Sequence, residues 1–105
     1  RSVEIRDVNY NIDARRMMVR MYYDEGASLA LDSQLHSFRG YLQRHRNIGY
    51  HRDLNLNFVQ MAQRILRLDP GDKQARERLR TRINNEKYLA ERAWLLGLVK
   101  GKHEQ

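Results

Sequence analysis

The chain has 105 residues, of which 41% are hydrophobic and 31% are charged, with a formal net charge of +7. It contains no cysteine, which excludes disulfides and thiolate metal sites. No apolar run reaches the ~18–20 residues that a membrane helix needs, and no signal peptide is visible, so we expect a cytoplasmic protein that does not enter membranes.

A chain of this length supports one modest hydrophobic core, so we expect a single α-helical domain over residues 1–105. Because the chain begins at Arg1 and not at methionine, we expect it to be an excised segment of a larger protein. Of the 20 basic residues, 16 are arginine, which favours ion pairing or attraction to polyanions.

Residues 1–11 could form either a short extended piece or a frayed helical turn. A clear helical pattern begins after them, at Ile12-Asp13. Asp13 is predicted as the N-cap, and Ile12 and Met17 have the spacing of a hydrophobic staple. Gly26 is expected to end the helix. The stripe that we expect to face the core consists of Ala14, Met17, Met18, Met21 and Tyr22. Methionines at Met17, Met18, Met21 and Met61 could instead form an adaptable groove, but their helical spacing favours the core.

The second and third helices have stronger apolar patterns. Ser28 is predicted to cap the second, and residues 47–52 form a loop around Gly49, after which Asp53 caps the third. The second helix has a stripe of Leu31, Leu35, Phe38 and Leu42, widened by Leu29 and Tyr41. The third has one stripe of Leu54, Phe58, Met61, Ile65 and Leu68 beside another of Leu56, Val59, Ala62 and Leu66. A stripe this wide predicts burial on two sides, at the centre of the domain.

Asp69-Pro70-Gly71 forms a tight corner, because proline disfavours helix in the residue before it and glycine turns freely. Asp72 is predicted to cap a fourth helix over residues 73–86. Its apolar line is thin and consists of Ala75, Leu79 and Ile83. Arg76 and Arg80 flank this line on one side, and Arg78 and Arg82 flank it on the other.

A fifth helix is expected near residues 89–99, and residues 101–105 are expected to be a frayed end. Trp94-Leu95-Leu96 either closes the core or docks on a partner, and closing the core is favoured. No strand pattern competes anywhere in the chain. The predicted fold class is therefore all-α, with about five antiparallel helices.

The corner with Ala75 after it, and the succession of short antiparallel helices, resemble tetratricopeptide-like helical repeats. The expected helix starts do not recur every ~34 residues, so the resemblance is to a degenerate array. The chain is also similar to the C-terminal region of large bacterial helical-repeat proteins of unknown function. The matching stretches are 13–17 leading to Tyr22-Tyr23, 31–33 leading to Ser37-Phe38, 49–52 and 90–96. The resemblance implies that the chain is a C-terminal fragment of a larger helical-repeat protein. It also implies a short helical solenoid or bundle, and it implies no activity.

Arginines around the corner are candidate contacts for a polyanion, because phosphate binding needs several cations on one accessible face. The arginines considered are Arg64, Arg67, Arg76, Arg78, Arg80 and Arg82, and the favoured candidates among them are Arg64, Arg67, Arg76 and Arg80. The alternative is a solvated helix whose arginines pair with nearby carboxylates, and that alternative is favoured because the two flanks of the fourth helix point about 160–200° apart.

Residues 49–53 are the candidate interaction loop, with Tyr50, His51 and Arg52 side by side, although a structural role is favoured. His36, His45 and His51 lack the close spacing of zinc ligands, so no metal is expected. No catalytic motif or phosphate-binding loop is present, so we expect no enzymatic activity and no cofactor.

The sequence favours a non-enzymatic scaffold or protein–protein interaction module, because stacked helix pairs offer rigid grooves to peptides and proteins. Its partner would be another protein or the remainder of a parent chain. The alternative is a basic module that binds nucleic acid through an arginine-rich helix.

Overall fold

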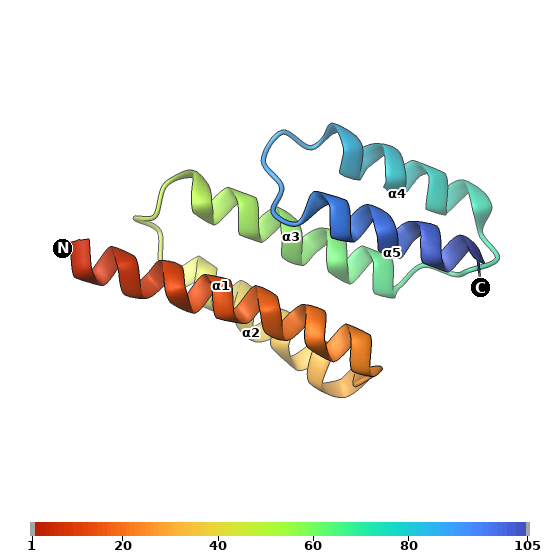
Figure 1. Ribbon diagram of the computed structural model, residues 1–105. Coiled ribbons are helices and arrows are strands. Elements are labelled where there is room, and N and C mark those ends of the chain that lie inside the picture. The colour runs from red at the N-terminus through yellow and green to blue at the C-terminus, as the bar shows by residue number, and fades with distance from the viewer. Residues whose placement is uncertain (1, 105) are drawn as a thin grey trace. The chain divides into compact units, whose positions relative to one another are not determined.

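The computed structural model describes the backbone of residues 2–104 and the side chains of residues 6–101. This part of the chain contains five helices and no strand, which confirms the predicted all-α class (Figure 1). The chain divides into two compact units, Arg1–Arg52 and Asp53–Gln105. Within each unit, consecutive helices run antiparallel. The single domain expected from the sequence stays a prediction.

The first helix, α1, spans Ser2–Glu25, so the ambiguous stretch at the start of the chain is helical from Ser2. The predicted cap at Asp13 is wrong, because Asp13 lies inside the helix and pairs with Arg16 at 2.8 Å. No glycine or proline interrupts the sequence before Gly26. An aspartate inside a helix costs only a fraction of a kcal/mol, about 0.7 at most, so the helix continues through it.

Gly26 ends α1, as predicted, with a positive φ of 68°. Its N–H donates to the Tyr23 carbonyl at 3.1 Å, and the Ala27 N–H donates to the Tyr22 carbonyl at 3.0 Å. This pair of hydrogen bonds is a Schellman motif, which satisfies the last carbonyls of a helix. The second helix, α2, follows at once over Ser28–Arg44, and Ala27 precedes it without a side-chain cap. The predicted Ser28 cap is therefore wrong.

In the first unit, α1 and α2 pack against each other. The apolar face predicted for α2 is buried, and its members are Leu31, Leu35, Phe38, Tyr41 and Leu42. Arg15 of α1 contacts this helix: its Nη1 donates to Ser37 Oγ at 3.1 Å, and its Cζ lies 4.4 Å from the centre of the Tyr41 ring. Leu29 does not widen the face as predicted, because it is 88% exposed.

The third helix, α3, spans Tyr50–Leu66 and begins earlier than predicted, so Asp53 lies in its first turn and does not cap it. Gly49 precedes it with a φ of 61°, and the Arg52 N–H donates to the Gly49 carbonyl. The wide buried face is confirmed, and its buried residues are Asn55, Phe58, Val59, Met61, Ala62 and Ile65.

The corner after α3 forms as its sequence predicts. Asp69 Oδ1 accepts the Gly71 N–H at 2.9 Å, and Asp72 Oδ1 accepts the Ala75 N–H at 3.0 Å. The second bond confirms Asp72 as the cap of α4, which spans Lys73–Asn85. Of the predicted apolar line, Leu79 and Ile83 are buried.

The last helix, α5, spans Arg92–Glu104, so it begins later than expected and continues through residues expected to be frayed; Gln105 lies outside the described residues. Leu95 is buried, and the Trp94 ring lies 6.1 Å from the Phe58 ring of α3. This segment therefore contributes to the core of the second unit, as predicted. The segment before α5 is tied to α3, because Asn57 donates to the Tyr88 carbonyl at 2.7 Å.

Arg92 connects the end of α4 to the start of α5. Its guanidinium donates to the carbonyls of Ile83, Asn84 and Glu86. The last carbonyls of a helix have no partner within the helix, and a cation is favoured near them. One side chain therefore completes the hydrogen bonding of α4 and sets where α5 begins.

We expect Arg92→Ala to lower the free energy of unfolding by about 2 kcal/mol, because it removes charge-assisted hydrogen bonds and leaves partly buried carbonyls unpaired. Urea unfolding followed by circular dichroism measures this change. Arg78→Ala is the matched control, since Arg78 is exposed and its side chain has no hydrogen bond to the described residues; it should change stability by less than about 0.5 kcal/mol. Equal losses in the two variants would contradict this role of Arg92.

Candidate functional site

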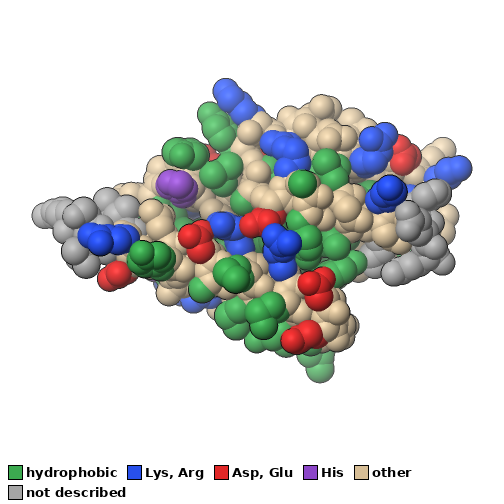
Figure 2. Space-filling model, in the orientation of Figure 1, with side chains coloured by type: hydrophobic (Ala, Val, Ile, Leu, Met, Phe, Trp, Pro, Cys, Tyr) green, Lys and Arg blue, Asp and Glu red, His purple; other side chains and the backbone are tan. Residues whose placement is uncertain are grey.

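One side of α1 is an exposed apolar surface, which we call the methionine face; its members are Tyr10, Ala14, Met17, Met18 and Met21. They are spaced so that they lie on one side of the helix. Tyr10 is 67% exposed, Met17 64% and Met21 52%. Figure 2 shows hydrophobic side chains gathered along α1 among charged residues. The prediction that Met17, Met18 and Met21 face the core is therefore wrong.

The rotation of α1 is decided by its other side. Ile12 and Val19 are buried, and they lie seven residues apart on one side of the helix. Arg15 lies between them in sequence and holds that side against α2 through Ser37 and Tyr41. The methionines consequently point outward. In α3, by contrast, Met61 is fully buried, as its spacing predicts.

A groove of about 340 Å³ borders the methionine face between α1 and α2. It is lined by Asn11, Ala14, Arg15, Met18, Gln34 and Ser37. Its lining combines apolar side chains with amide and hydroxyl groups. A partner side chain lying on the methionine face can therefore make both apolar contacts and hydrogen bonds at this edge.

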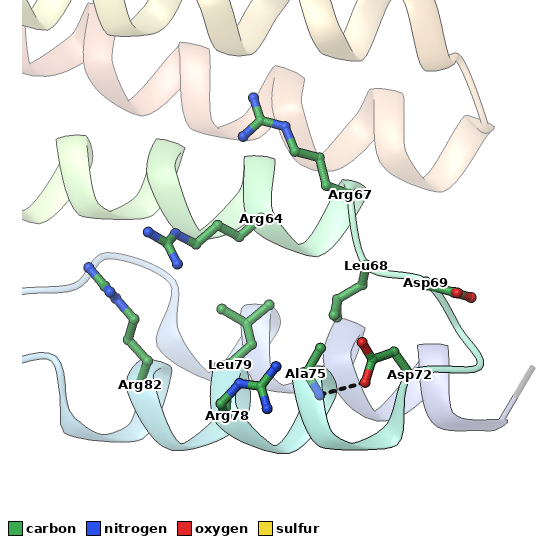
Figure 3. Close-up of a pocket in the computed structure, with 9 residues that line it drawn as sticks. All are labelled: Arg64, Arg67, Leu68, Asp69, Asp72, Ala75, Arg78, Leu79 and Arg82. Atoms are coloured by element: carbon green, nitrogen blue, oxygen red, sulfur yellow. Dashed lines mark hydrogen bonds between the residues drawn. The ribbon is translucent and has the colours of Figure 1, made fainter.

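A second surface, which we call the arginine groove, lies between the end of α3 and α4 and has a volume of about 580 Å³ (Figure 3). It is lined by Arg64, Arg67, Leu68, Asp69, Asp72, Ala75, Arg78, Leu79 and Arg82. Arg64 and Arg82 extend toward the same end of the groove, whereas the guanidinium of Arg67 points away from α4. The four arginines of the lining are exposed, and none of their guanidiniums bonds to another described residue; they are Arg64, Arg67, Arg78 and Arg82.

The candidate polyanion contacts do not all meet at this groove. Arg64 and Arg67 border it, but Arg76 is only 5% exposed and donates to the Pro70 carbonyl at 3.1 Å. Arg80 pairs with Glu77 at 2.9 Å and borders a different groove, between α4 and α5.

Arg78 and Arg82 line the arginine groove, although they were considered and not kept among the four favoured candidates. The signal that could have found them was in the sequence. They are four residues apart on α4, on the flank opposite Arg76 and Arg80. The sequence separates the two flanks correctly, but it does not show which one meets α3.

The candidate interaction loop is helical, which corrects the prediction. Tyr50, His51 and Arg52 form the first turn of α3 because Gly49 ends the preceding loop. Tyr50 is exposed and stacks on the His51 ring at 4.5 Å. Arg52 Nε donates to the Leu42 carbonyl at 3.0 Å, near the end of α2. Arg52 therefore has a structural role, in agreement with the alternative that the sequence favoured.

No group of three His, Cys, Asp or Glu residues is arranged to hold a metal ion within the described part of the chain. His45 stacks on Tyr41, and its Nδ1 lies 2.9 Å from the Tyr41 carbonyl oxygen. Burial, and then the neighbouring Asp24 carboxylate, raise the pKa of Tyr23 above its ordinary value, so this phenol stays protonated at neutral pH.

None of the described helices is both long enough and apolar enough to cross a membrane. Comparison of the chain with family models, with curated proteins and with solved structures gave no match. The two surfaces described above are therefore the physical basis for proposing a function.

We expect Met17→Asp and Val19→Asp to behave in opposite ways. Met17→Asp should change the free energy of unfolding by less than about 0.5 kcal/mol, because an exposed carboxylate stays hydrated. Val19→Asp should cost about 3 kcal/mol or more, since it buries a carboxylate without a partner. Urea unfolding of both variants tests the orientation of α1. A large loss for Met17→Asp with none for Val19→Asp would contradict the assignment of the methionine face.

Proposed function

We propose that this chain is a non-enzymatic protein-interaction module that binds a protein partner through the methionine face of α1. The observation that carries the proposal is the exposure of Tyr10, Met17 and Met21 on one side of a regular helix. Single exposed apolar residues are ordinary, but a contiguous exposed apolar surface is typical of an interaction site.

The chemistry of the methionine face suits a helical partner. Methionine side chains are unbranched and polarisable, so they adapt to partner surfaces of different shapes. An amphipathic helix can lay its apolar side against such a surface and bury both. The partner would be another protein or the remainder of a parent chain. The antiparallel helices of each unit are compatible with a tetratricopeptide-like array, and this relationship is part of the proposal.

Nucleic-acid binding, the alternative function, has less support. A helix that binds phosphates should present its cations on one accessible face. Here Arg76 is buried and Arg80 is paired with Glu77, whereas Arg78 and Arg82 face another groove. The basic charge of α4 is therefore divided between two sides.

Site-specific photo-crosslinking tests the proposal. A photoreactive amino acid replaces Met17 in one variant and exposed Ser33 of α2 in a matched control, and each is expressed in cells of the source organism. We expect Met17 to give an adduct of one defined mass and Ser33 to give none. The double variant Met17→Asp, Met21→Asp should then lose at least about tenfold in affinity for the protein identified, because charge replaces apolar contact.

The crosslinking experiment has a clear negative result. If position 17 gives no defined adduct, or if positions 17 and 33 give the same adducts, the methionine face does not bind a partner. Circular dichroism of the double variant shows that its fold is intact, which separates lost binding from unfolding.

A further inference from the structure

We propose that the arginine groove binds an acidic peptide segment in which a leucine-type side chain lies beside carboxylates. This site lies in the second unit, on α3 and α4, whereas the methionine face belongs to α1 of the first unit. The proposal therefore goes beyond the function proposed above. It stands or fails independently of the methionine face.

The cations of the groove are available for a ligand. Arg64, Arg78 and Arg82 are exposed, and their guanidiniums bond to none of the described residues. Elsewhere in the chain arginines pair with carboxylates one turn away, as Arg16 does with Asp13 and Arg80 with Glu77. The absence of such pairing here leaves like charges directed toward one groove.

The arrangement of these cations suits carboxylates. Arg78 and Arg82 are one turn apart on the same side of α4. Arg64 of α3 and Arg82 extend toward one end of the groove, whereas the Arg78 guanidinium lies near Ala75 (Figure 3). A guanidinium presents parallel N–H donors that match the two oxygens of a carboxylate. An acidic segment that enters the groove can therefore be held from both helices at once.

The apolar floor indicates that the ligand is more than a simple anion. Leu68, Ala75 and Leu79 form part of the lining; Leu68 and Ala75 are half-buried and supply most of its accessible apolar surface, because Leu79 is almost fully buried. The volume of about 580 Å³ is far larger than one phosphate or carboxylate group needs. A leucine-type side chain would cover this floor and remove apolar surface from water.

The acidic end of the arginine groove favours a peptide ligand over RNA. Asp69 and Asp72 lie at the end opposite Arg64 and Arg82, near Leu68 and Ala75 (Figure 3). An RNA strand carries uniform negative charge and would bring phosphates beside these carboxylates. Single-stranded nucleic acids are also commonly held by base stacking on aromatic rings, and no aromatic residue is among the groove's described lining.

Fluorescence anisotropy with defined probes tests the proposal. The first probe is a labelled flexible peptide in which leucines lie beside Asp and Glu residues among glycine and serine. The second replaces every acidic residue with lysine, and the third replaces every leucine with serine. The fourth is a single-stranded oligouridine that carries the same negative charge as the first peptide.

The protein variants are Arg82→Gln in the groove and Arg80→Gln as the matched control, since both remove one positive charge from α4. We expect the acidic leucine peptide to bind and the lysine peptide not to bind. Arg82→Gln should weaken binding about tenfold, the loss typical of one charge-assisted hydrogen bond, whereas Arg80→Gln should change it less than about twofold. The serine peptide should bind several-fold more weakly.

Three results would overturn the proposal. The first is no binding of the acidic leucine peptide at low salt. The second is tighter binding of oligouridine than of the peptide, which would make the groove a phosphate site. The third is an equal loss in Arg82→Gln and Arg80→Gln, which would show attraction to the net charge of the chain and not to this groove.

Discussion

The hydrogen bond from the buried Arg76 side chain to the Pro70 carbonyl constrains the corner between α3 and α4. Arg76 projects from α4 back to the corner that precedes it, and its side chain is buried there. Together with the Asp72 cap, this bond fixes the direction in which α4 leaves the corner. That direction places Arg78 and Arg82 beside the end of α3, so the arginine groove exists only while the corner is intact.

The two candidate surfaces differ in chemistry because they arise from different causes. The methionine face is the side of α1 that remains exposed after Ile12 and Val19 have been buried, and methionine side chains adapt to surfaces of different shapes. The arginine groove is formed by side chains of two helices, and its fixed charges give direction to a ligand. The first surface therefore offers apolar area, and the second offers charges in fixed positions.

Local sequence signals were sufficient for several features. The Leu35–Phe38–Leu42 stripe of α2 and the Asp72 cap of α4 follow from spacing and residue type within a few positions. The predicted separation of the α4 arginines onto two flanks also holds, since one flank borders α3 and the other borders α5. These features depend on helical geometry, which is a property of neighbouring residues.

Other features could not be read from neighbouring residues. Helix α1 has two apolar stripes. Periodicity alone predicted burial of the longer stripe, which contains Met17 and Met21, whereas packing buries the stripe that contains Ile12 and Val19. The sequence by itself determined that there are five helices in the described part of the chain, the corner between α3 and α4 and the charge of α4, but not where α1, α3 and α5 begin. Only the tertiary structure decided which stripe is buried and which arginines share a groove, because both depend on how a helix is rotated against its neighbour.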